Sequence, residues 1–237
     1  MAEIIPAIMP KNYEDLKNKI AMVRHVVSLV QIDICDGVFV KNTTWPRTDF
    51  NHSPDDHFYK IINEEEGLPF WEDIEFELDL MTIDAIENFD GYAKLGPKRI
   101  VFHVEAVVGE KDEKLGEFKE FLEGIDMYVR DNIEIGIALN PSTQTEKIFS
   151  LVNNVDFVQC MGIDKIGFQG EEFDERCLEN IKKIKEKFGD VLVSVDGGVN
   201  VENAKDIIKA GADRLVIGSA IFNSSDIKEK IQEFQVL

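Results

Sequence analysis

Acidic and amide side chains occur two residues apart inside short apolar segments of this chain. The segment LVQIDIC carries Gln31 and Asp33, and the segment IEFELDLM carries Glu77 and Asp79. Residues i and i+2 of a β-strand point to the same face. Two such strands would present an amide and three carboxylates together, a set of groups that could bind a divalent cation or transfer a proton.

Two further apolar segments repeat this pattern. RIVFHVEA carries His103 and Glu105, and VLVSVDGG ends in Asp196 and two glycines. A buried carboxylate costs several kcal/mol unless it is paired, hydrogen-bonded or bound to a metal. One such group could be structural, but Asp33, Asp79 and Asp196 on three separate strands favour a functional site. A buried polar network is the alternative.

Short apolar segments alternate along the chain with longer amphipathic, charged segments, and these elements must position the side chains above. Such alternation is typical of βαβ units and a parallel sheet. Eight units close a (β/α)8 TIM barrel, so we predict this α/β fold as a single domain over residues 1–237. An open doubly wound sheet is the alternative, but no GxGxxG follows the first segment. The predicted strands lie within residues 3–9, 29–35, 74–81, 99–106, 133–140, 155–163, 191–198 and 214–222.

Local signals also place helix ends. Asn12 and Asn200 are predicted N-caps, and Gly189 and Gly211 are predicted to end helices.

Residues 43–73 interrupt the alternation with three prolines, several aromatic residues and a short helix at most. We interpret this stretch as a long surface insertion, with a lid or a contact surface as alternatives.

Glycine-rich loops follow the last three predicted strands. Loops after strands 7 and 8 form the recurrent phosphate site of TIM barrels, using backbone N–H groups and helix N-termini. Such loops need no basic patch, which fits an acidic chain. The predicted substrate- and phosphate-binding residues are Gly167, Phe168, Gln169, Gly170, Gly197, Gly198, Gly218 and Ser219.

The charge and cysteine content restrict the partners. The formal net charge is −20, which argues against nucleic acid and anionic membrane surfaces as partners. Three cysteines without a CxxC pair fit a reducing compartment. The N-terminus MAEIIPAIMP has no basic region ahead of its short apolar stretch, so no signal peptide is predicted. We therefore expect a cytoplasmic protein, with homo-oligomerisation left open.

Several motifs in a fixed order carry a family resemblance. Together they resemble the ribulose-phosphate 3-epimerase family along nearly the whole chain, most closely in its last third. The motifs are PAIM (6–9), IDICDGVFVKN (32–42), ELDLM (77–81), FHVEA (102–106), ALNPST (138–143), GFQGEEF (167–173), VDGGVN (195–200) and AGADRLVIGSAIF (210–222).

The resemblance implies a TIM barrel that moves a proton at C3 of a ketopentose phosphate. One aspartate removes the proton, and a second on the opposite face returns one. These aspartates correspond to Asp33 and Asp196. In the family a divalent metal between them holds the enediolate oxygens. This logic is chemically sound, because an enediolate needs a nearby positive charge and inversion needs an acid and a base on opposite faces.

This chain departs from the family pattern at the metal site. Family members bind the metal with two histidines and two aspartates, and the histidine positions hold Gln31 and Asp79 here. The family serine after the first proline is Ala7, and the family loop NPGFGGQ reads DKIGFQGE. His103 belongs to a motif that family members share, so we interpret it as a wall or hydrogen-bonding residue.

The altered ligands leave two outcomes for the metal. Residues Gln31, Asp33, Asp79 and Asp196 could form an all-oxygen site, which suits Mg²⁺, Mn²⁺ or Ca²⁺ better than Zn²⁺. Alternatively, no metal binds and proton transfer is lost or altered.

Three functions therefore stand open. The leading hypothesis is an isomerase that interconverts ribulose 5-phosphate and xylulose 5-phosphate or a related ketose phosphate. The second is a non-catalytic barrel that binds a sugar phosphate and has lost the metal. The third, an aldolase or decarboxylase, needs a buried lysine at a strand end. Lys165 stands beside Asp164 and is interpreted as solvated.

Overall fold

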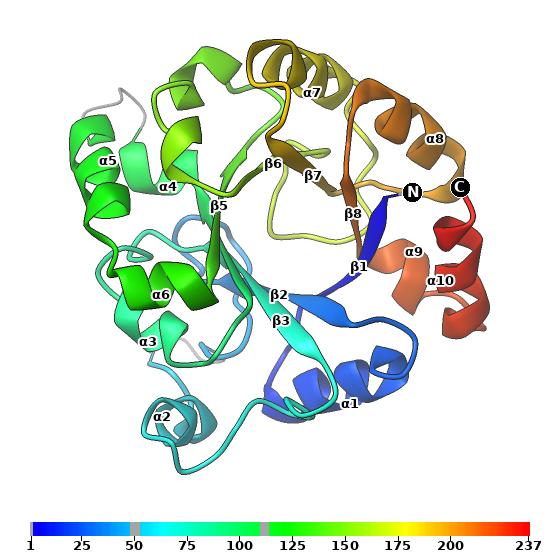
Figure 1. Ribbon diagram of the computed structural model, residues 1–237. Helices are drawn as coiled ribbons and strands as arrows, with labels where there is room; N and C mark the ends of the chain where they lie inside the picture. Colours follow the sequence, from blue (N-terminus) through cyan, green and yellow to red (C-terminus); the bar gives the residue numbers. More distant parts are fainter. Residues whose placement is uncertain (1, 48–52, 110–113) are drawn as a thin grey trace.

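The predicted closed barrel of eight parallel strands is present in the structure, a computed structural model that describes residues 2–47, 53–109 and 114–237 (Figure 1). Each strand pairs with the next along the chain, and the last pairs with the first through a register that sets Glu3 opposite Arg214. The strands are β1 (Glu3–Ile8), β2 (Leu29–Cys35), β3 (Glu75–Met81), β4 (Arg99–His103), β5 (Glu134–Leu139), β6 (Phe157–Met161), β7 (Leu192–Asp196) and β8 (Arg214–Ile217).

Helices surround the strands on the outside of the barrel (Figure 1). They cover the outer strand faces, which is why the strands are apolar at nearly every outward position. Among the described residues, no helix combines the length and the apolarity that crossing a bilayer would require. The helices are α1 (Tyr13–Val23), α2 (Asp56–Ile62), α3 (Phe89–Ala93), α4 (Val104–Val108), α5 (Leu115–Gly124), α6 (Met127–Asn132), α7 (Arg176–Lys187), α8 (Val201–Ala210), α9 (Ser219–Phe222) and α10 (Ile227–Gln235).

The predicted helix caps are confirmed at three positions. The Asn12 side chain accepts a hydrogen bond from the Asp15 N–H at the start of α1. Asn200 caps α8 through a reciprocal pair of hydrogen bonds with Asn203. Gly211 ends α8 with a φ of 118°, a conformation that favours glycine. These caps fix where α1 and α8 start and where the loop after β7 ends.

One predicted strand end is wrong. The strand predicted over residues 99–106 stops at His103, and Val104 begins α4. Within residues 214–222, the strand ends at Ile217 and α9 begins at Ser219, so Gly218 and Ser219 follow the strand and precede a helix, as predicted. A short apolar stretch has the same pattern in a strand and in a buried helix, so periodicity alone could not separate them.

The segment over residues 43–73, interpreted as a surface insertion, also carries several side chains of the core. The predicted short helix is present as α2, but Trp45 is fully buried and Phe58, Ile61 and Leu68 are nearly so. They belong to the same apolar core as the outward side chains of the strands. The chain thus uses this segment to complete its core on the side of β2 and β3. Residues 48–52 lie outside the described residues.

We expect Trp45→Ala to lower the free energy of unfolding by about 3–5 kcal/mol, because a large aromatic side chain would leave a cavity in the core. The Trp45 ring packs beside Tyr13 and Phe58. Trp71, which is 63% exposed, provides the matched control: Trp71→Ala should cost less than about 1 kcal/mol. Guanidinium titration of both variants makes the comparison, and equal costs would contradict a core role for Trp45.

The end of the barrel away from the predicted site is closed by ion pairs. Arg99 pairs with Glu134 at 3.1 Å and with Glu3 at 3.1 Å. Arg214 pairs with the same two glutamates at 3.1 and 3.2 Å. This ring of alternating charges joins β1, β4, β5 and β8. Glu77 lies beside it, 3.6 Å from Arg99, and burial raises the pKa of Glu77 to about 8.

Candidate active site

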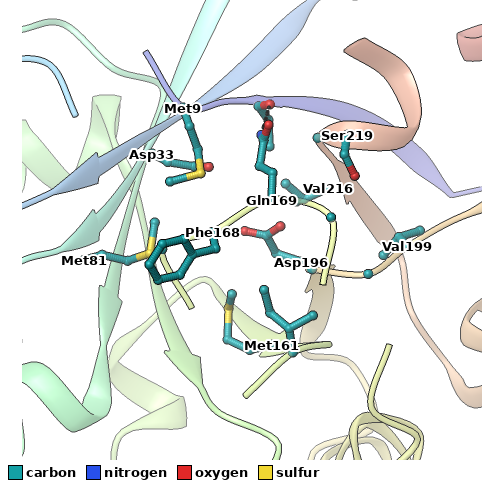
Figure 2. A pocket seen from close by; sticks show the side chains of 17 residues that line it. Met9, Asp33, Met81, Met161, Phe168, Gln169, Asp196, Val199, Val216 and Ser219 are labelled. Atoms are coloured by element: carbon teal, nitrogen blue, oxygen red, sulfur yellow. Dashed lines mark hydrogen bonds between the residues drawn. The ribbon is translucent and has the colours of Figure 1, made fainter. Parts of the chain in front are cut away.

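A cavity opens at the carboxyl ends of the strands (Figure 2). Polar side chains are few among its lining residues, which makes each of them a candidate for substrate contact. The lining residues are Ala7, Met9, Asp33, Met81, Met161, Ile163, Gly167, Phe168, Gln169, Gly170, Asp196, Gly197, Gly198, Val199, Val216, Gly218 and Ser219.

Asp33 and Asp196 both line this cavity, and the buried Gln31 side chain forms hydrogen bonds to both of them. The Gln31 Nε2 donates to Asp33 Oδ1 at 2.7 Å and to Asp196 Oδ2 at 2.9 Å. Gln31 is completely buried, whereas the two aspartates retain 5% and 9% exposure toward the cavity. The two aspartates predicted to transfer protons therefore lie at the wall of one cavity.

Asp79 lies deeper and is held by two other strands. His103 Nε2 lies 2.8 Å from Asp79 Oδ1, and Gln159 Nε2 donates to Asp79 Oδ2 at 3.4 Å. All three side chains are completely buried. Burial opposes a charge on His103, but the adjacent Asp79 carboxylate outweighs burial and raises the pKa of the imidazole. His103 is therefore a hydrogen-bonding residue, as predicted.

The three aspartates form one cluster. One carboxylate oxygen from each of Asp33, Asp79 and Asp196 lies within 4.8 Å of the other two. Burial, and then the charges of Asp196 and Asp79, raise the pKa of Asp33 well above its usual range. Burial and the charge of Asp79 raise the pKa of Asp196 to about 7. Both shifts express the cost of crowding buried negative charges, which a proton or a cation would relieve.

The donor set fits an oxygen-binding divalent cation. Three carboxylates meet within 4.8 Å, a spacing that one ion can span. Gln31 Oε1 is buried and has no hydrogen-bond partner among the residues that the structure describes. Such an unpaired acceptor beside an acidic cluster is a further potential oxygen ligand. The four predicted metal-binding residues are thus brought together.

Loop contacts fix Asp33 at the end of β2. The Thr44 hydroxyl donates to the Asp33 carbonyl oxygen at 2.6 Å and accepts from the Cys35 N–H at 2.8 Å. The Asp36 carboxylate accepts from the backbone N–H groups of Val38 and Phe39. The turn after β2 is therefore tied down, which limits the positions open to Asp33.

Glycines bring backbone close to the cavity on the side of β7 and β8. Gly197 and Gly198 have φ values of 102° and 66°, so both favour glycine. A Cβ on Gly198 would also lie 2.7 Å from the Phe173 Cα, where only backbone could yield. Gly218 and Ser219 line the same wall. This arrangement suits an anion held by backbone N–H groups.

The loop after β6 closes over the same wall. Gln169 Nε2 donates to the Ala7 carbonyl oxygen at 3.1 Å, and Asn42 Nδ2 donates to the Gly167 carbonyl oxygen at 3.1 Å. Gly167 packs so tightly on Val40 that a Cβ there would lie 2.7 Å from the valine Cβ. Phe168 is 43% exposed at the cavity mouth. The predicted residues Gly167–Gly170 thus lie beside Asp33 and Asp196, as Figure 2 shows for Phe168 and Gln169.

Three further polar residues show where the sequence predictions differ from the structure and where they agree. Glu105 does not share a strand face with His103, because it lies in α4, where its carboxylate accepts from the Asn140 N–H and the Thr143 hydroxyl. Gln159 went unnoticed, although an amide inside the apolar segment VDFVQCMGI is the signal that singled out Gln31. Lys165 is exposed and near Glu171, as its interpretation as a solvated residue requires.

Methionines form much of the remaining cavity wall. Met9, Met81 and Met161 surround the space next to Asp33 and Asp196 (Figure 2). Their flexible, polarisable side chains exclude water without adding charge. The sequence offered no signal for them, because an apolar side chain at a strand end looks like core.

Comparisons with known sequences identify relatives over almost the whole chain. A sequence model described as "Ribulose-phosphate 3 epimerase family" matches residues 3–222. A ribulose-phosphate 3-epimerase of Bacillus subtilis is 28% identical over 241 residues, covering 99% of each chain. One from Schizosaccharomyces pombe is 26% identical, covering 97% of this chain and 91% of the relative.

Solved structures share the fold at lower identity. KGPDC from Streptococcus mutans aligns with a TM-score of 0.68 at 13% identity, covering 100% of this chain and 96% of that chain. A 3-hexulose-6-phosphate synthase aligns with a TM-score of 0.62 at 17% identity, covering 99% and 98%. These likenesses show that the chain shares the barrel of these proteins.

Proposed function

The chain belongs to the ribulose-phosphate 3-epimerase family, and from that premise we propose that it interconverts ribulose 5-phosphate and xylulose 5-phosphate or a closely related ketose phosphate. The observation that carries the proposal is the placement of Asp33 and Asp196 at one cavity wall beside a glycine-lined cup. The proposed location is the cytoplasm, which suits three free, buried cysteines.

The reaction needs an acid and a base. The C3 hydrogen of such a sugar is weakly acidic because it neighbours the carbonyl carbon. We assign its removal to one of Asp33 and Asp196 and the return of a proton on the opposite face to the other. Without a cation, burial and the charge of Asp79 raise the pKa of Asp196 to about 7, and a bound cation would lower this pKa by adding positive charge.

The substrate anion is assigned to the glycine-rich wall. Backbone N–H groups of Gly197, Gly198, Gly218 and Ser219 would bind the phosphate, beside the N-terminus of α8. The loop Gly167–Gly170 would cover the bound sugar phosphate and exclude water. This placement sets the phosphate beside Asp196, which directly precedes Gly197 in the chain.

A divalent cation would be held by oxygen atoms of Gln31, Asp33, Asp79 and Asp196. When bound, it would supply positive charge beside the developing enediolate oxygens. His103 and Gln159 orient Asp79, and the loop contacts of Thr44 orient Asp33. The protein's own part is to hold these carboxylates close and shielded from water.

Turnover of ribulose 5-phosphate by the purified protein tests the proposal. We expect xylulose 5-phosphate to accumulate to equilibrium when Mn²⁺ or Mg²⁺ is present, followed by NMR of the sugar. The changed residues Gln31 and Asp79 favour a second candidate, a sugar-phosphate-binding barrel without catalysis. Tight binding of ribulose 5-phosphate with no turnover at any divalent cation would overturn the epimerase proposal in favour of that candidate.

A further inference from the structure

The Gln31 amide links the two carboxylates assigned to proton transfer. Its Nε2 donates to Asp33 Oδ1 at 2.7 Å and to Asp196 Oδ2 at 2.9 Å. Asp33 lies two residues farther along β2, whereas Asp196 comes from β7, 165 residues away in sequence. A primary amide has two N–H donors and no charge, so both donors are used on these two carboxylates.

This link engages the same two carboxylates that a cation would bind. Two buried carboxylates repel each other unless a proton, a cation or hydrogen-bond donors lie between them. In the structure the donors are those of Gln31. A divalent ion that binds Asp33 and Asp196 together would therefore have to displace the amide N–H groups from the two carboxylates.

The other end of the amide has no partner. Gln31 Oε1 is completely buried and lacks a hydrogen-bond partner within the described part of the chain. An unpaired buried acceptor costs free energy and calls for an explanation. Turning the amide about its last bond would exchange the two ends and bring this oxygen to the aspartate cluster, where it could bind a cation.

Acceptors for the displaced N–H groups exist on the neighbouring strand. Gln31 pairs in register with Glu77 of β3, as Asp33 pairs with Asp79. Glu77 Oε1 is buried and without a hydrogen-bond partner among the described residues, and Glu77 Oε2 lies 3.6 Å from Arg99. Glu77 shares the inward strand face with Gln31, so it would be the acceptor for the amide N–H groups once the amide has turned.

We propose that Gln31 is a two-position residue: its N–H groups join Asp33 and Asp196 in the cation-free protein, and its Oε1 replaces them as a ligand when a divalent cation binds. The inference rests on the proposed function for the presence of the cation. A neutral imidazole at this position could bind a cation through its free ring nitrogen, but with a single N–H it could not donate to both aspartates. The amide thereby competes with the cation and would also supply an oxygen ligand to it.

NMR of the side-chain amide tests the turnover directly. In ¹⁵N-labelled protein the Gln31 NH₂ pair is assigned by its loss in Gln31→Met. We expect Mg²⁺, which is diamagnetic, to shift this pair upfield as its hydrogen bonds to the two aspartates are lost. An unmoved pair under Mg²⁺ concentrations that calorimetry shows to saturate the site would overturn the proposal.

Binding measurements on variants provide the second test. Gln31→Met keeps the length of the side chain and removes donor and acceptor, so we expect a lower melting temperature without cation and Mg²⁺ affinity weakened about tenfold. Gln31→Glu adds a fourth carboxylate, and we expect a lower cation-free melting temperature and tighter Mg²⁺ binding. Asn180→Leu is the control, because this buried amide donates to the Pro141 carbonyl oxygen and does not line the cavity, so the Mg²⁺ affinity of the variant should change less than threefold.

The outcomes separate this inference from the proposed function. Mg²⁺ binding to Gln31→Met that is equal to or tighter than wild type would overturn the ligand role of Oε1. Absence of Mg²⁺ binding to the wild-type protein would also overturn the inference, whereas the epimerase proposal would still stand or fall on turnover of ribulose 5-phosphate.

Discussion

Asp196→Asn is expected to lower kcat for epimerisation by about 10³-fold or more, because amide groups do not accept and return protons at neutral pH. Asparagine has nearly the same shape, and its Oδ1 can still accept from Gln31, so the fold should persist. Asp33→Asn should have an effect of similar size. The measurement is the rate of xylulose 5-phosphate formation at saturating ribulose 5-phosphate, with melting temperatures recorded for both variants.

Deuterium exchange then separates the two carboxylates. In D₂O each variant should still exchange the C3 hydrogen of one epimer through its remaining aspartate, with retention of configuration. The two variants should exchange opposite epimers. Asp164→Asn is the control, since Asp164 is exposed, pairs with Arg176 and lies outside the cavity wall. Exchange of the same epimer by both variants would contradict the assignment of opposite faces.

Removing divalent cations is expected to lower turnover at least 100-fold, with recovery on addition of Mn²⁺ or Mg²⁺. Three carboxylates and an amide oxygen form a hard donor set, so Zn²⁺ should restore less activity. Metal analysis of the chelated protein must accompany the assay. Cation at 100 times its dissociation constant should also stabilise the fold by about 2.7 kcal/mol, measurable as a higher melting temperature.

Full turnover by protein that metal analysis finds empty would contradict this prediction. Gln31 would then serve as the permanent link between Asp33 and Asp196, and the aspartates would work without a cation. Recovery with Zn²⁺ alone would contradict the oxygen-ligand assignment instead, because Zn²⁺ prefers imidazole and thiolate.

The barrel could be predicted because its signals are local. Each strand is an apolar segment bounded by turn residues, and eight repeats leave little choice of closure. The candidate site residues could be predicted in the same way, because Asp33 and Asp79 are polar side chains in the middle of apolar strands. Where that local signal weakened, as in the short apolar stretch after His103, the strand end was misplaced.

Contacts between distant segments could not be predicted. The hydrogen bond from Gln31 to Asp196 joins residues 165 apart, and it depends on the tilt and closure of the whole sheet. The pairing of Asp79 with His103 and Gln159 has the same origin. The burial of Trp45 could not be predicted for a different reason. Its sequence neighbours include proline and polar residues, which suggest a surface loop, and only the packing of α2 against the barrel explains its burial.

The ion-pair ring of Arg99, Arg214, Glu3 and Glu134 has a consequence for tolerance to substitution. It joins four strands at the end of the barrel opposite the cavity, and none of its four residues lines the cavity. Because closure at that end does not depend on the cavity residues, substitutions at positions such as Gln31 and Asp79 can change the donor set while the eight strands stay closed.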